Sequence, residues 1–206
     1  MIGLTVEGGL WTITLNRPDK ANSLTATMLE DLVSLTARAA TEGAQVLVLT
    51  GAGKVFSAGA DLEAARAGLA TSPLWERLSG QIAALPCLTI AALNGTLAGG
   101  ATGMALACDL RIAVAGAKFF YPVMKLGFLP QPSDPARMAA LIGPARTKLI
   151  LMGGQKIDAD TALAYGLIDR IVDADALVQT AHDIAADTLA ANPAIARQIK
   201  VMCSPD

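Results

Sequence analysis

Apolar residues along the chain occur in two kinds of spacing, which together predict strands alternating with helices. Short runs that are almost entirely apolar indicate buried strands, and apolar residues three or four positions apart indicate helices that bury one face. A glycine turn at residues 7–9 separates the first two runs and predicts a hairpin. This alternation is typical of the α/β class. The predicted strands are residues 4–6, 11–15, 46–50, 88–93 and 110–114, and the predicted helices are residues 25–43, 72–86 and a glycine-opened helix that ends at residue 108.

From Ser133 onward the pattern changes to short helices in series. Asp134 and Pro135 resemble an N-cap and a first helical residue, Gly143 resembles a helix end, and Pro144 starts the next helix. Because no Gly/Ser-rich or Pro-rich linker interrupts the chain, we expect a single domain, residues 1–206, with an α/β part at 1–132 and a helical part at 133–206. Later elements are predicted at residues 158–166 (helix), 167–172 (strand-like) and 175–192 (helix).

The composition and charge of the chain argue against nucleic-acid-binding, membrane-spanning and secreted proteins. The chain has 206 residues, 53% of them hydrophobic, and a net charge of −2 without blocks of like charge, which argues against a nucleic-acid partner. The mean hydropathy of +0.47 is high. Even so, no stretch supplies the roughly 18 uninterrupted apolar residues of a membrane span, and residues 7–9 interrupt the N-terminus too early for a signal peptide. We therefore expect a cytoplasmic protein with three reduced cysteines that buries further apolar surface by oligomerising.

Two glycine-rich loops follow buried strands. The first is residues 57–61 (Ser-Ala-Gly-Ala-Asp), and the second is residues 94–103. Small residues let a ligand approach backbone N–H groups, and a glycine-opened helix start favours negative charge. Two such loops could direct two N–H donors at one oxygen atom, which is the arrangement of an oxyanion hole. Residues 51–54 fit neither a P-loop nor a dinucleotide fingerprint.

Five segments in the same order resemble the crotonase superfamily, also called the enoyl-CoA hydratase/isomerase family. The resemblance covers nearly the whole chain, and the ordered set is far more specific than any one loop. The segments are Leu15-Asn16-Arg17-Pro18 with Lys20, Asn22 and Leu24; residues 56–62; Asn94-Gly95 through Gly99-Gly100 with residues 107–113; Ala117-Lys118-Phe119 with Pro122, Leu126-Gly127 and Pro130; and Asp158-Ala159 through Ala162 with residues 166–168 and 171–172.

The resemblance implies a spiral of β-β-α units, a homotrimer or dimer of trimers, and CoA thioester substrates. It places the thioester oxygen between the backbone N–H groups of Ala60 and Gly100. It also implies that CoA enters only as part of the substrate and that no separate cofactor is needed. Because the chain has a single histidine, we expect no bound metal. The residues implied to lie along the CoA phosphates and pantetheine are Lys20 and Ala21, and those implied to border its adenine are Ala58, Asp61 and Leu62.

The sequence departs from the family at the positions that carry its acids. Hydratases of the family use two glutamates to activate and deliver water, and the corresponding positions are Gly103 and Val123. Some isomerases and a dehalogenase place an acid slightly later, where this chain has Gln131. None of these side chains can carry a proton. Ordinary hydration of an enoyl-CoA is therefore not expected, and isomerisation or another single-proton reaction fits better.

Several polar residues could replace those acids. Asp134 could reach the acyl pocket, although the strong helix-start signal before Pro135 favours a helix N-cap, which needs no catalytic role. Tyr121 could donate a hydrogen bond or a proton, or could simply form an aromatic wall. Gln131 could bind substrate without transferring protons, and Lys125 is expected at the surface.

The remaining reactive residue types do not suggest a site. The single histidine, His182, lies mid-helix and far along the chain from any candidate serine, and Cys108 is expected to be a small buried residue. The chain ends soon after Lys200, where the family usually continues into further helices. The leading hypothesis is an acyl-CoA enzyme that passes through an enolate. The alternative is an inactive subunit that binds acyl-CoA or acts as a scaffold.

Overall fold

The predicted hairpin begins the larger of two sheets in the computed structural model, which describes residues 1–203. β1 (Ile2–Glu7) pairs antiparallel with β2 (Leu10–Leu15), and all later pairs in this sheet are parallel. The predicted buried strands are confirmed with nearly the expected bounds. In sheet order they are β3 (Val46–Gly51), β5 (Leu88–Leu93) and β7 (Leu110–Val114), followed by β10 (Arg170–Val172) at the edge.

A second, smaller sheet was not predicted. Its strands are too short to show an alternating pattern, and the sequence there suggested only loops. β9 pairs antiparallel with β8, and the other pairs are parallel. In sheet order the strands are β4 (Val55–Ser57), β6 (Thr96–Ala98), β8 (Lys118–Phe120) and β9 (Ile157–Asp158).

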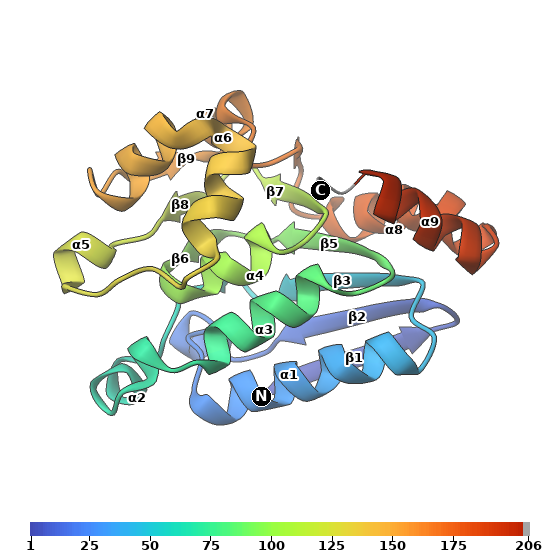
Figure 1. Ribbon diagram of the computed structural model, residues 1–206, viewed down its shortest axis with the longest axis horizontal. Helices are drawn as coiled ribbons and strands as arrows, with labels where there is room; N and C mark the ends of the chain where they lie inside the picture. The colour runs from blue at the N-terminus through green and yellow to red at the C-terminus, as the bar shows by residue number, and fades with distance from the viewer. Residues whose placement is uncertain (204–206) are drawn as a thin grey trace.

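The two sheets together form a repeating spiral. β3, β5 and β7 lie side by side in the larger sheet (Figure 1). The strand that follows each of them, β4, β6 and β8, lies in the smaller one. Each pair of strands is followed by helix, so the chain repeats a β-β-α unit. This confirms the α/β class and the spiral architecture. It also shows that residues 133–206 are not only helical, because they contribute β9 and β10.

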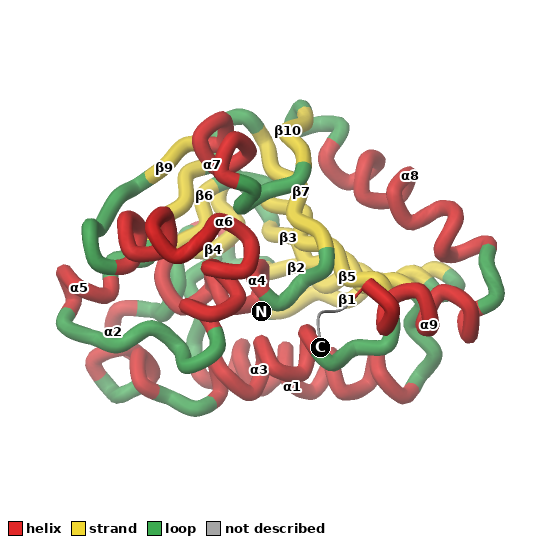
Figure 2. Tube along the Cα trace, turned by 45° about the horizontal axis from the view of Figure 1, so that its top comes forward, coloured by secondary structure: helices red, strands yellow, loops and turns green. Residues whose placement is uncertain are grey.

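Helices cover both faces of the larger sheet. α1 (Ala26–Thr41) begins at the predicted N-cap Thr25, whose hydroxyl accepts from the Met28 N–H at 3.3 Å. α1 and α3 lie on one side of the sheet, and α8 lies across the other (Figure 2). The other helices are α2 (Leu62–Arg66), α3 (Leu74–Ala83), α4 (Thr102–Leu106), α5 (Val123–Leu126), α6 (Asp134–Leu151), α7 (Ala159–Tyr165), α8 (Leu177–Ala190) and α9 (Pro193–Cys203).

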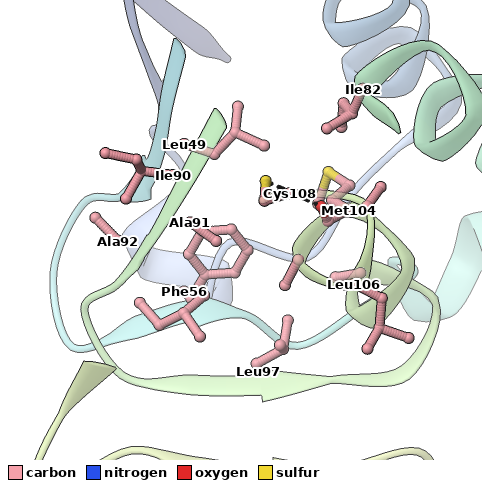
Figure 3. Packing of buried hydrophobic residues seen from close by; sticks show 14 of the residues in the cluster. Leu49, Phe56, Ile82, Ile90, Ala91, Ala92, Leu97, Met104, Leu106 and Cys108 are labelled. Atoms are coloured by element: carbon pink, nitrogen blue, oxygen red, sulfur yellow. Dashed lines mark hydrogen bonds between the residues drawn. The ribbon is translucent and has the colours of Figure 1, made fainter. Parts of the chain in front are cut away.

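The core between the sheets and α4 is apolar and closely packed. Phe56 and Leu97, from the smaller sheet, face Ala91 of β5 and Leu106 of α4 (Figure 3). Cys108 is buried there, and its thiol donates to the Met104 carbonyl at 3.3 Å. Burial raises the pKa of this thiol to about 12, which confirms the expectation of a small buried residue.

Candidate active site

Three loops meet at the carboxyl ends of the neighbouring parallel strands β4, β6 and β8. The first loop (residues 58–61) follows β4, the second (99–101) follows β6, and the third (121–131) follows β8. In parallel sheets, ligands bind outside the carboxyl ends of the strands. The order of the strands thus brings the two predicted glycine-rich loops and the segment with Tyr121 to one edge.

A parallel bridge between Leu24 and Ala60 helps to hold the first loop in place. The Leu24 N–H donates to the Gly59 carbonyl at 2.8 Å, and the Asp61 N–H donates to the Leu24 carbonyl at 2.8 Å. Successive backbone groups of an extended segment point to opposite sides, so the Ala60 N–H faces away from Leu24. Gly59 has φ +91°, and a side chain there would lie 3.0 Å from the Ala98 carbonyl oxygen. Only glycine allows the two loops to approach this closely.

Gly100 lies in the 3-10 turn η3 (Gly99–Ala101), which leads into α4. The indole of Trp75 lies directly behind it, because a methyl group on Gly100 would be 3.2 Å from Cδ2 of that ring. The ring is fixed by a hydrogen bond from Nε1 to the Leu69 carbonyl at 2.7 Å. The regular helix after Gly100 is shorter than predicted, so its dipole contributes less at Gly100 than a long helix would.

The three loops border a cavity of about 420 Å³. Ala60 and Gly100 both line it, so the two glycine-rich loops border the same space. Most of the wall is apolar, and among residues 1–203 Arg66 is the only charged side chain on it. Such a space suits an acyl chain with a polar head near the two glycine-rich loops. The lining residues are Ala58, Ala60, Leu62, Ala65, Arg66, Ala70, Trp75, Ala98, Gly99, Gly100, Phe120, Tyr121, Pro122, Val123, Leu126, Phe128, Leu129 and Gln131.

Tyr121 joins this cavity to a buried carboxyl group. Tyr121 is 4% exposed, and its hydroxyl donates to Oδ2 of Asp134 at 3.0 Å. The Gln131 N–H donates to the same hydroxyl oxygen at 3.4 Å. Burial, and then the charge of Asp134, raise the pKa of Tyr121 above its ordinary value. Asp134 itself does not line the cavity, so it lies behind Tyr121.

Asp134 is 0% exposed, and its Oδ1 accepts no hydrogen bond from residues 1–203. Burial raises its pKa from 3.8 to about 6, against the lowering effects of the Tyr121 hydrogen bond and the Arg137 charge. The carboxyl group packs against Gly103, where a methyl group would lie 2.7 Å from Oδ1. Asp134 therefore occupies the space that a side chain at position 103 would need.

The interpretation of Asp134 as a helix N-cap is wrong. Asp134 is the first residue of α6, the N-cap is Ser133, and Ser133 makes no capping hydrogen bond with its side chain. The carboxyl group points to Tyr121 instead of to the backbone of its own helix. The Asp-Pro pair is typical of a helix start in sequence, but a side chain at the first helical position is free to turn into the core.

The other predicted residues are placed as follows. Val123 and Gln131 line the cavity, whereas Lys125 is exposed, as expected. His182 lies on α8, beside the hairpin residues Thr5 and Glu7 and away from the cavity.

The residues expected to bind CoA divide into two groups. Ala58 and Leu62 line the cavity, but Lys20, Ala21 and Asp61 do not. Lys20 is exposed at the end of the turn η1 (Pro18–Lys20). The Ala21 carbonyl accepts from the Ala58 N–H at 3.0 Å, so this loop supports the first glycine-rich loop.

Asp61 has a structural role that the sequence did not indicate. Its Oδ1 accepts from the N–H groups of Glu63 and Ala64 at the start of α2, at 3.0 and 3.3 Å. Its Oδ2 pairs with Arg17 at 2.8 Å, and this hydrogen bond holds the pKa of Asp61 below its ordinary value. Arg17 thus connects the loop before α1 to the cavity wall. Arg17 and Asp61 both belong to segments that resemble the family in the sequence. Their ion pair joins residues that are 44 positions apart, so the sequence could not predict it.

Comparisons with known proteins give a consistent result. A model of the family described as enoyl-CoA hydratase/isomerase matches residues 5–204. The chain is 34% identical to the probable enoyl-CoA hydratase echA6 of Mycobacterium leprae, over 83% of this chain and 71% of that protein. It is 33% identical to the 1,2-epoxyphenylacetyl-CoA isomerase of Escherichia coli, over 87% of this chain and 72% of that protein.

The fold is also similar to solved structures. The enoyl-CoA hydratase from Bacillus anthracis superimposes with a TM-score of 0.90 at 33% identity, covering 97% of this chain and 80% of that one. Within residues 1–203, no helix has the length and apolar character needed to cross a membrane.

Proposed function

Since the chain belongs to the enoyl-CoA hydratase/isomerase family, we propose that it acts on acyl-CoA thioesters through an enolate and moves one proton instead of adding water. The observation that carries this proposal is the pair formed by Tyr121 and Asp134 at the wall of the cavity, together with the absence of an acid at Gly103 and Val123.

The backbone N–H groups of Ala60 and Gly100 are proposed to hold the thioester oxygen. Removal of a proton next to the thioester carbonyl places negative charge on that oxygen. Two fixed donors stabilise the charge without reorganising, and removing one such donor typically costs a factor of about 10² to 10³ in rate. The contact between the loops at Gly59 keeps the two donors at a fixed separation.

Tyr121 is proposed to be the group that exchanges the proton with the substrate. As its phenol oxygen accepts the substrate proton, its own hydroxyl proton moves to Oδ2 of Asp134. Tyr121 and Asp134 together have then gained one proton. Return of a proton along the same path to the γ-carbon completes the shift of a double bond. Asp134, with a pKa near 6, is ionised and able to accept a proton at neutral pH.

Isomerisation is favoured over hydration because this site has one proton path. Hydration needs one group that activates a water molecule and a second that protonates the α-carbon. The two family positions for such groups hold Gly103 and Val123. Restoring a glutamate at position 103 would place its Cβ 2.7 Å from Oδ1 of Asp134, so the two acids compete for one space.

The test compares variants on a 3-enoyl-CoA, for isomerisation, and on crotonyl-CoA, for hydration. We expect isomerisation by the unaltered protein and negligible hydration. Tyr121→Phe and Asp134→Asn should each lower kcat by about 10² to 10⁴, the typical contribution of acid–base catalysis. The double variant should be little worse than either single variant, because the two groups act as one unit.

Tyr165→Phe is the matched control, because Tyr165 is the only other tyrosine and lies on α7, outside the cavity. Its kcat should be unchanged. Full isomerase activity in Tyr121→Phe would overturn the proton path, and robust hydration by the unaltered protein would overturn the reaction class. Acyl-CoA binding without turnover of any thioester would instead favour a binding subunit.

A further inference from the structure

Two consecutive residues of α3 reach the two halves of the proposed site. Trp75 packs its ring against Gly100, on the loop that supplies one N–H donor. Glu76, the next residue, contacts the first turn of α6. α3 and α6 both pack against α4, one on each side of it (Figure 1). One helix therefore supports both the loop with Gly100 and the helix that carries Asp134.

Glu76 holds the residue directly before Asp134 through two hydrogen bonds. Its Oε2 accepts from the Ser133 N–H at 3.1 Å, and its Oε1 accepts a short hydrogen bond from the Ser133 hydroxyl. Ser133 is the N-cap of α6, so its hydroxyl is used for this contact and not for its own helix. The carboxylate of Glu76 thus satisfies a backbone N–H at a helix start and fixes the direction in which α6 begins.

We propose that Glu76 is a positioning residue of this site: through Ser133 it orients Asp134 toward Tyr121, and together with Arg137 it sets the charge state of Asp134. The proposal deepens the proposed function and rests on the proton path through Tyr121. Glu76 and Arg137 themselves do not line the cavity, so neither touches the substrate.

The charged and titratable groups around Asp134 come from three elements. Tyr121, from the loop after β8, donates a hydrogen bond to Asp134. Arg137 lies one turn further along α6, and its Nη1 donates to the Ser79 hydroxyl of α3 at 2.9 Å. The charge of Glu76 raises the pKa of Asp134, and the charge of Arg137 lowers it. The two residues therefore act on Asp134 in opposite directions.

The experiment measures the pH dependence of kcat and, separately, the titration of the Asp134 carboxyl group by NMR with ¹³C-labelled aspartate. The Asp134 signal is identified as the one missing from Asp134→Asn. In the unaltered protein, kcat should rise with pH through a limb near pH 6, because the relay needs ionised Asp134.

Opposite shifts are expected from two charge-neutralising variants. Glu76→Gln should move both the kinetic limb and the NMR midpoint to lower pH, and Arg137→Gln should move both to higher pH. Each shift should be about 0.3 to 1 pH unit, as for one charge at a partly screened distance. Glu76→Gln keeps an acceptor for Ser133, so its plateau kcat should stay within about threefold, whereas Glu76→Ala should lose at least about tenfold in kcat with little change in KM.

The two proposals fail in different ways. Unmoved or same-direction NMR midpoints in Glu76→Gln and Arg137→Gln would overturn the role of Glu76 and Arg137, whatever the activity. A normal plateau in Glu76→Ala, with native circular dichroism, would overturn the positioning role. NMR shifts as expected, but with a kcat that does not follow them, would leave Glu76 acting on Asp134 and would overturn the proton path instead.

Discussion

At the scale of single residues, the carboxyl group of Asp134 stands where α4 presents a glycine. Its Oδ1 approaches Gly103 so closely that a methyl group there would lie 2.7 Å away. This carboxyl group comes from α6 and accepts a hydrogen bond from Tyr121, which lines the cavity, and the glycine at position 103 leaves room for it. The sequence has no side chain at position 103, and the structure shows that the carboxyl group of Asp134 occupies the space beside it.

The stability of the protein should depend on pH through Asp134. Folding raises its pKa from 3.8 to about 6, so the folded state binds more protons than the unfolded state between these values. The free energy of unfolding therefore falls as pH rises from about 4 to about 6, by up to about 3 kcal/mol for this group. Asp134→Asn cannot ionise, so it should be more stable than the unaltered protein at pH 8 and nearly equal to it at pH 4.

Urea unfolding at pH 4 and pH 8 measures this difference, because other groups titrate alike in the two proteins. Asp183→Asn is a suitable control, since Asp183 lies on the exposed surface of α8 and its substitution should give the same small change at both pH values. A stability difference between Asp134→Asn and the unaltered protein that is independent of pH would contradict a raised pKa.

At the scale of elements, α6 is two helical segments joined at Gly143. Gly143 has φ +79° and ψ +159°, a conformation that almost only glycine adopts, and Pro144 begins the second segment. This confirms the predicted end and restart of the helix. At the break, Thr147 of the second segment donates from its hydroxyl to the Gly143 carbonyl at 2.9 Å.

Gly143→Ala should lower the free energy of unfolding by about 1 to 3 kcal/mol, the cost of a side chain in that backbone conformation. Nothing lies within 4 Å of a side-chain carbon at Gly143, so the effect is conformational and not steric. Gly80→Ala is the matched control: Gly80 is inside α3 and also has open space around it. There the same change should raise stability by about 0.5 to 1 kcal/mol. Thermal unfolding of both variants tests the signs, and a stabilised Gly143→Ala would refute the argument.

At the scale of the whole molecule, Arg111 joins the α/β part to the C-terminal part. It is a buried residue of β7 whose Nε donates to the Leu167 carbonyl at 3.0 Å and whose Nη1 donates to the Cys108 carbonyl at 2.6 Å. Its Nη2 pairs with Asp169 at 3.3 Å. One guanidinium group therefore donates hydrogen bonds both to a backbone carbonyl just after α4 and to a backbone carbonyl in the segment that leads into β10.

Arg111→Met should destabilise the whole chain by about 2 to 5 kcal/mol, because it leaves two buried carbonyl groups without donors. Unfolding should remain one cooperative transition if residues 133–206 are part of the same domain. Asp169→Asn should cost much less, since its side chain is 39% exposed and the amide oxygen can still accept from the Arg111 N–H. Urea denaturation followed by two probes measures both effects. An equal loss in the two variants would show that the ion pair, and not the carbonyl contacts, carries the stability.

The sequence by itself determined the larger sheet, most of the helices and the family. Long apolar runs and helical periodicity reflect burial along one segment, and a single segment contains that information. The ordered glycine-rich motifs identified the same architecture that the spiral of β-β-α units confirms. The residues of the two glycine-rich loops could be named in advance, because backbone approach requires small residues at fixed places in the chain.

Only the tertiary structure decided how the polar groups are paired. The three-residue strands of the smaller sheet have no pattern of their own and form because β4, β6 and β8 lie side by side. The contacts between Tyr121 and Asp134, Glu76 and Ser133, and Arg17 and Asp61 join different elements, so local spacing cannot predict them. For this reason the sequence could not choose between the two interpretations of Asp134, and the N-cap interpretation is the wrong one. A helix start looks the same in the sequence whether its carboxyl group caps the backbone or turns into the core, and packing against Gly103 decides which occurs.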